Sequence, residues 1–209
     1  MAIQKPTVPV FTRLLFGLVL FGFGLALVVL GDFGVSPWEV LHQGISRRTP
    51  LSIGTTIIFV GIIILIFLFL LKEPMGVGTI ANVLVIGLVV DLTLSLFGEI
   101  SNIFPRIIAT LFGPFFVALG SGFYIGTRLG PGPRDGLMTA FNRRGLAIWK
   151  ARTLIEGTCV ITGLILGGTI GWGTVWFLLS VGPSVQFFLN RLEIKDQLPG
   201  MNHIHETPN

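Results

Sequence analysis

The chain has 209 residues, of which 52% are hydrophobic and only 11% are charged. Soluble domains carry about 25% charged residues, so this composition excludes an ordinary soluble globular protein. The net charge of +4 comes without a basic stripe interleaved with aromatic residues, which argues against a nucleic-acid partner.

Apolar residues are gathered in long blocks, each about long enough to cross a bilayer roughly 30 Å thick as a helix. The blocks predict spans at 13–31, 53–71, 77–97, 107–127, 153–170 and 172–190. The first block is too long for the core of a signal peptide and lacks a small-residue cleavage site, so we expect it in the mature protein. The predicted fold is therefore an all-α polytopic membrane protein of about six transmembrane helices.

The positive charges predict an orientation for these spans. With both termini in the cytoplasm, eleven of the 14 Lys and Arg residues lie on the cytoplasmic side, and Arg47, Arg48 and Arg106 lie on the other. Cytoplasmic loops carry the excess of Lys and Arg in bacterial membrane proteins. We expect a multi-pass protein of a bacterial cytoplasmic membrane, surrounded by lipid, with both termini inside.

The two halves of the chain share landmarks at a nearly constant spacing. Residues 33–41 match 129–137, and the pair Arg47-Arg48 matches Arg143-Arg144, both 96 residues later. The Gly-x-Gly-Thr sequence at 76–79 recurs 95 residues later. Since each half holds three spans, an odd number, a duplication would insert the halves in opposite orientations. The predicted organisation is a cytoplasmic tail (1–12), two inverted three-helix repeats (13–98 and 106–190) and a polar C-terminal tail (191–209).

Within each repeat, a short segment begins with proline, at Pro37 and at Pro133. Proline suits the first turn of a helix, where its missing N–H breaks no bond, so we expect short helices over 36–46 and 133–144. Glu39 and Asp135 fall in these first turns, where a carboxylate interacts favourably with free backbone N–H groups. Two interpretations stay open: amphipathic helices at the membrane interface, or broken or re-entrant helices that line a polar cavity.

A cavity of this kind would bring together a candidate substrate-binding set from both segments. Arg134 would favour an anionic or carboxylate-bearing group, or would be one more cytoplasmic anchor, and Trp38 could stack against an apolar or cationic group. The candidate residues are Ser36, Trp38, Glu39, His42, Arg134 and Asp135.

Three ionisable residues lie in or next to the predicted spans, where such groups are costly and usually face the bundle interior. Arg152 and Glu156 stand four residues apart, so they share a helix face and can pair. Asp91 has no partner nearby in the sequence, and Gln186 takes its place in the second half. Each is a candidate coupling site, and the alternatives are mutual neutralisation of the pair and a structural bond from Asp91 to a neighbouring helix.

Glycines recur in the first and fourth spans, including Gly17, Gly24, Gly113 and Gly120, and predict faces where helix backbones approach closely. No cysteine cluster, metal-binding histidine motif or Ser-His-acid set is present, so we expect neither an enzyme nor a bound metal or cofactor.

Several ordered strings, namely 36–44, 52–55, 130–138 and 152–156, resemble the YczE/YyaS/YitT-like bacterial membrane proteins. The resemblance spans about residues 13–190 and implies a multi-pass protein of the cytoplasmic membrane. It carries over no catalytic or ligand residues. Glu39 stands where aspartate is as often expected, a change that keeps the carboxylate.

These observations favour a small-solute secondary transporter or permease with its site at the interface of the inverted repeats. The alternative is a membrane-embedded substrate-binding or accessory subunit of a larger complex. The substrate would be a small molecule or an ion, and the chain would act as a homodimer or with a partner membrane subunit.

Overall fold

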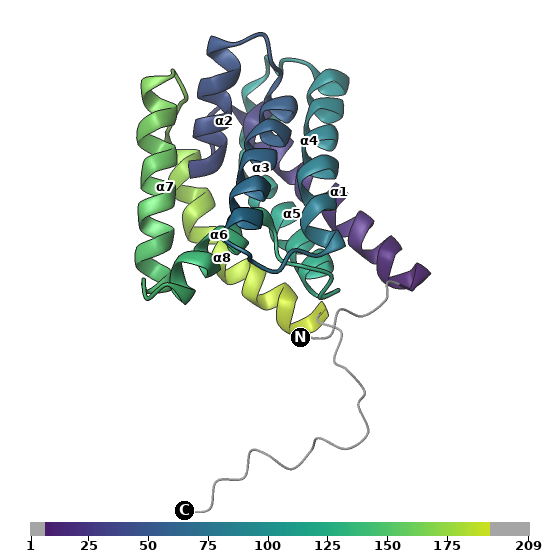
Figure 1. Cartoon of the computed structure of the whole chain (residues 1–209). Coiled ribbons are helices and arrows are strands. Elements are labelled where there is room, and N and C mark those ends of the chain that lie inside the picture. The colour runs from purple at the N-terminus through teal and green to yellow at the C-terminus, as the bar shows by residue number, and fades with distance from the viewer. Residues whose placement is uncertain (1–6, 193–209) are drawn as a thin grey trace, which may run out of the picture.

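The computed structural model describes residues 7–192, and every regular element between these positions is a helix (Figure 1). The elements are α1 (Val8–Gly31), α2 (Pro37–Arg48), α3 (Ile53–Leu70), α4 (Val77–Phe97), α5 (Ile103–Ile125), α6 (Pro133–Arg143), α7 (Ile148–Ile165) and α8 (Trp172–Leu192). Because this part of the chain contains no strand, the predicted all-α class is confirmed.

Five helices of the described residues, α1, α3, α4, α5 and α8, are long and apolar enough to cross a membrane. Their outward faces carry large apolar side chains, such as Phe69 at 70% exposure and Leu88 at 62%. Faces of this kind suit lipid and are too apolar for water. The chain is accordingly a polytopic membrane protein.

Several helix boundaries differ from the sequence prediction by four or five residues: α5 begins at Ile103 instead of residue 107, and α7 ends at Ile165 instead of residue 170. Helix α7 begins at Ile148 instead of residue 153, and its Lys150, Arg152 and Glu156 give it a more polar composition than the five spans. The total of six spans therefore stays a prediction. Helix α1 begins at Val8, so residues 8–12 of the predicted N-terminal tail are helical, with Pro9 tolerated in the first turn. In the predicted C-terminal tail, residues 193–209 lie outside the described residues.

Helices α1 and α5 cross at the centre of the bundle and run in opposite directions. A Cβ on Gly24 would lie 2.6 Å from the carbonyl oxygen of Gly113, and a Cβ on Gly17 would lie 2.8 Å from that of Gly120. Only glycine permits so close an approach of two backbones, so the predicted packing role of these glycines is confirmed.

Helices α2 and α6 have 12 and 11 residues, about 18 Å at 1.5 Å per residue, and are too short to cross a bilayer. Each begins at a proline in its first turn, as predicted, and each ends in arginine. Their N-terminal ends lie toward the middle of the bundle and their C-terminal ends lie at opposite ends of it (Figure 1).

The loop before each short helix binds the N-terminus of a helix in the other half of the chain. The backbone N–H of Gly173 donates to the carbonyl of Phe33 at 2.8 Å, and that of Gly78 donates to the carbonyl of Leu129 at 2.9 Å. These two bonds are related by the 95- and 96-residue spacings of the sequence. Each loop therefore completes the first turn of α8 or α4, whose N–H groups lack partners within their own helix.

An arginine at the C-terminal end of each short helix likewise binds a helix in the other half of the chain. Arg48 donates from Nε to the carbonyl of Leu166 at 3.2 Å, at the end of α7. Arg144 donates from Nη2 to the carbonyl of Leu71 at 3.0 Å, at the end of α3. A cation beside the last carbonyls of a helix satisfies free acceptors and the negative end of the helix dipole.

One pair of helices breaks this correspondence. Helix α3 packs along α4, where a Cβ on Gly87 would lie 2.5 Å from the carbonyl oxygen of Gly54. Helix α7 packs against α2 instead of along α8. Gly182 occupies the place of Gly87, and a Cβ added to it would have no atom of the described residues within 4 Å. The bundle is therefore closed between α3 and α4 and open between α7 and α8.

Candidate functional site

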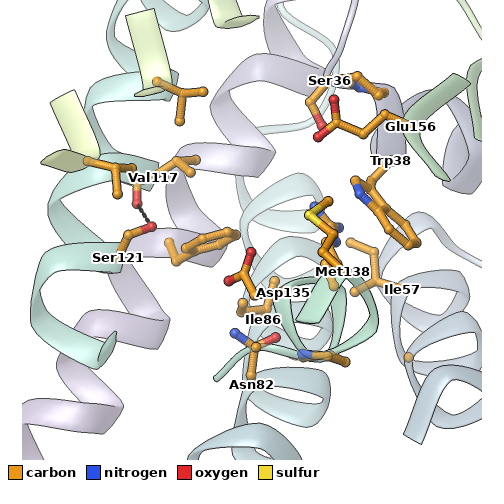
Figure 2. Close-up of a pocket in the computed structure, with 18 of the residues that line it drawn as sticks. Ser36, Trp38, Ile57, Asn82, Ile86, Val117, Ser121, Asp135, Met138 and Glu156 are labelled. Carbon is orange, nitrogen blue, oxygen red and sulfur yellow. Dashed lines mark hydrogen bonds between the residues drawn. The ribbon is translucent and has the colours of Figure 1, made fainter. Parts of the chain in front are cut away.

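A cavity of about 320 Å³ lies where the N-terminal ends of α2 and α6 approach each other. Its walls also include residues of α3, α4, α5, α7 and α8. Figure 2 shows Asp135 near the middle of this space, with Met138 and Trp38 on one side and Ser121 on the other. Seven of the nine predicted site residues line it, namely Ser36, Trp38, His42, Arg134, Asp135, Arg152 and Glu156.

Arg134 joins the two short helices. Its Nη2 donates to Oε1 of Glu39 at 2.6 Å, and its guanidinium carbon lies 5.1 Å from the centre of the Trp38 ring. Glu39 lies behind Arg134 and is only 1% exposed. A buried carboxylate requires such a partner, because removing an ion from water is costly. Arg134 therefore compensates Glu39 and holds the first turns of α2 and α6 together.

His42 stands next to this pair, one turn along α2. Its Nδ1 lies 3.5 Å from Oε1 of Glu39, and the His42 side chain is 2% exposed. Neither Nδ1 of His42 nor Oε2 of Glu39 has a hydrogen-bond partner among the described residues. Buried polar atoms usually have partners, so these two atoms mark a place for a water molecule, a proton or a solute group.

Asp135 faces the cavity from the first turn of α6. A Cβ placed on the neighbouring Gly132 would lie 2.9 Å from the Tyr124 hydroxyl, 3.5 Å from the Asn82 amide nitrogen and 3.7 Å from Oδ2 of Asp135. These polar groups from α4, α5 and α6 thus surround the glycine and converge on one part of the cavity. A larger residue than glycine would fill this space.

The third charged group of the cavity comes from α7. Arg152 donates from Nε to Oε1 of Glu156 at 2.9 Å, the pairing expected from their spacing. Glu156 is 19% exposed and Arg152 is 53% exposed. In Figure 2 the Glu156 carboxylate lies beside Ser36, which precedes α2. The pair therefore belongs to the cavity wall and remains partly accessible.

Asp91 lies elsewhere, at the N-terminus of α3. Its carboxylate accepts from the backbone N–H of Gly54 at 2.7 Å, from that of Thr55 at 3.0 Å and from the Ser52 hydroxyl. The first N–H groups of a helix have no partner within it, so Asp91 acts as a cap supplied by the neighbouring helix α4. This is the structural bond that the sequence left open as an alternative.

Replacing Asp91 with alanine is expected to destabilise the protein by about 1–3 kcal/mol, because the Gly54 N–H loses its acceptor and the Thr55 N–H keeps only the Ser52 hydroxyl. Asparagine keeps one acceptor oxygen, so its effect should be smaller. The control is Gln186→Ala on α8, since Gln186 occupies the matching place but bonds Asn190 on its own helix. Thermal unfolding of the purified protein in detergent measures all three, and equal shifts for Asp91→Ala and Gln186→Ala would contradict the capping role.

Sequence reasoning missed the cavity residues that come from α4 and α5. These are chiefly Asn82, Ser121 and Tyr124. Two of them carried a signal: Asn82 is an amide within an apolar span, and Tyr124 is the only tyrosine of the chain. Ser121 carried none, because its hydroxyl bonds the Val117 carbonyl of its own helix, as serines in apolar helices commonly do.

Comparison with known proteins places the chain among membrane proteins. A family model, described as a family of unknown function, DUF6198, matches residues 10–190. A Haemophilus influenzae protein is 37% identical over 187 residues, which cover 89% of this chain and 86% of that protein. The Bacillus subtilis membrane protein YczE is 30% identical over 83% of this chain and 82% of its own length.

A second Bacillus subtilis protein, YyaS, is 25% identical over 85% of this chain and 90% of its own length. No solved structure matches the chain. The predicted resemblance to YczE and YyaS is therefore confirmed. Because the family match extends from the first turns of α1 to the end of α8, this membrane protein belongs to the DUF6198 family.

Proposed function

We propose that this protein is a small-solute secondary transporter of the cell membrane, with its binding site in the cavity between α2 and α6. The observation that carries the proposal is the meeting of two short helices, N-terminus toward N-terminus, at a cavity with polar and apolar walls. Interrupted helices of this kind form solute sites in transporters, where their free backbone groups and dipoles face the solute.

The proposal includes an inverted duplication of three spans, 13–98 and 106–190. It is supported by the reciprocal bonds of the Phe33 and Leu129 loops and of Arg48 and Arg144. It is also supported by the antiparallel crossing of α1 and α5, where Gly17 contacts Gly120 and Gly24 contacts Gly113. Gly113 and Gly120 lie 96 residues after Gly17 and Gly24, so the two contacts exchange under the repeat. Two halves related in this way can exchange an open and a closed side, which is the basis of alternating access.

The proposed orientation places both termini in the cytoplasm, on the evidence of the eleven-to-three division of Lys and Arg. Single cysteines in a Cys159→Ala background test it. A cysteine at Thr49, after α2, is expected to react with a membrane-impermeant thiol reagent added to intact cells. A cysteine at Asn142, near the end of α6, is expected to react only in inverted vesicles. Labelling of both positions from the same side would contradict the inverted arrangement.

Transport itself is tested with the purified chain in liposomes. We expect uptake of a small solute driven by a proton or sodium gradient and abolished when an ionophore dissipates that gradient. Asp135→Asn should reduce uptake strongly, whereas Asp32→Asn, at the far end of α1 in an ion pair with Arg106, should not. Failure of the folded chain to transport any solute in a broad screen, together with co-purification of an ATPase, would contradict the proposal and favour an accessory subunit.

A further inference from the structure

We infer that the cavity takes a small organic cation with an apolar body, and that its positive group binds at Asp135. This inference rests on the proposed function, since it names the solute class of the same cavity. Three properties of the cavity carry it: its charge, the chemistry of its walls and its open side.

The ionisable groups around the cavity leave one negative charge unbalanced. Arg134 pairs with Glu39, and Arg152 pairs with Glu156. Asp135 has no ion pair among the described residues, although it faces the same cavity. His42 does not pair with Asp135, because its Nδ1 lies 3.5 Å from Oε1 of Glu39.

The Asp135 side chain is exposed at the cavity and has no ion pair among the described residues, so the site favours a ligand that brings one positive charge. Its polar neighbours are the Tyr124 hydroxyl and the Asn82 amide, and neither is charged. A divalent metal ion would need several oxygen ligands around it. The structure presents one carboxylate, and no group of three His, Cys, Asp or Glu side chains suited to a metal occurs within residues 7–192.

Much of the remaining cavity wall is apolar. It is formed by side chains of α4, α5 and α8, including Ile86, Val117, Phe177 and Val181. Ligand sites of this type bind the apolar body of a molecule by excluding water and use a few polar groups to orient it. The 320 Å³ of the cavity fits a small organic molecule, and the face of Trp38 is already occupied by Arg134. Phe21 and Phe177, which also line the cavity, are therefore aromatic rings left to contact the ligand.

The open side of the cavity also suits an apolar body. Leu178 and Gly182 of α8 line the cavity and are exposed, and α7 does not pack along this part of α8. The matching faces of α3 and α4 are closed by the contact of Gly54 with Gly87. An amphipathic cation can therefore enter from the bilayer between α7 and α8, with its charge toward Asp135.

The test uses the full-length protein in detergent and three phenyl probes: phenyltrimethylammonium, its uncharged isostere tert-butylbenzene, and the anion phenylacetate. The quaternary ammonium is expected to raise the unfolding temperature in a saturable way, and the other two probes are not. Asp135→Asn should weaken binding of the cation at least tenfold. Asp32→Asn, which carries the same chemical change outside the cavity, should bind like the parent protein.

Tighter binding of phenylacetate than of the ammonium probe would overturn the inference, and so would equal affinity in Asp135→Asn. Absence of stabilisation by phenyltrimethylammonium and by its longer alkyl analogues, in folded protein, would overturn it as well. These outcomes concern the solute class alone. If the liposome assay finds uptake of an anion, the transporter proposal stands and the cation class is wrong. If the cation binds at Asp135 but nothing is transported, the cation class stands and the transporter proposal is wrong.

Discussion

Replacing Arg134 with methionine is expected to cause the largest loss of stability of any single charge removal in the cavity, about 3–5 kcal/mol. The reason is that Glu39, 1% exposed, would lose its guanidinium partner and remain as a buried, unpaired carboxylate. For a chain of this size the loss corresponds to a fall in unfolding temperature on the order of 10 °C. Thermal unfolding in detergent measures it.

Two variants separate this effect from the loss of side-chain contacts. The double variant Glu39→Gln with Arg134→Met is expected to recover most of the stability, since neither charge is then left without its partner. Arg152→Met removes a guanidinium from a half-exposed pair and should cost no more than about 1 kcal/mol. If Arg134→Met and Arg152→Met have the same effect, Arg134 does not compensate a buried charge.

Alanine at Gly34 or at Gly130 is expected to destabilise the protein by about 2–5 kcal/mol, and to a similar extent at both positions. Both glycines have a positive φ, +101° and +129°, which costs an L-residue roughly 1–2 kcal/mol. A Cβ would also lie 2.3 Å from the Gly171 nitrogen or 2.6 Å from the Thr79 hydroxyl, and overpacking adds about 1–3 kcal/mol.

The matched control for these two variants is Gly145→Ala. Gly145 has a φ of +93°, but no atom of the described residues lies within 4 Å of a Cβ added there. Its substitution should therefore cost only the backbone strain. Thermal unfolding of the three variants separates strain from steric conflict. A large effect at Gly34 with none at Gly130 would show that the two loops are not equivalent.

Much of the helical layout could be predicted from the sequence, because it follows from local chemistry. Apolar blocks of about 20 residues predict spans whatever their neighbours are, and the prolines at 37 and 133 mark where the short helices begin. The start of α7 was one of the exceptions. Its first turns mix Ile148 and Trp149 with Lys150 and Arg152, so the apolar block starts later than the helix does.

The contacts of the site could not be predicted, because they join residues distant in the sequence. Glu39 and Arg134 are 95 residues apart, and nothing local indicates that, within the described part of the chain, a cation pairs with this carboxylate and none with Asp135. Asp91 looked like a lone intramembrane charge, yet the first turn of α3 supplies its donors. The repeat alone would have predicted that α7 packs along α8 as α3 packs along α4. The open side between α7 and α8 arises because α7 packs against α2 instead.

Access to the cavity from both sides of the membrane tests the transporter proposal most directly, since it requires no knowledge of the solute. Ser121 lines the cavity from α5, and cysteine replaces only its hydroxyl oxygen by sulfur, so Ser121→Cys in a Cys159→Ala background changes the cavity wall little. Its reaction with a small, membrane-impermeant thiol reagent is measured in right-side-out and inside-out vesicles. Alternating access is expected to give labelling in both. Labelling from one side only, under every ion gradient applied, would contradict a transporter.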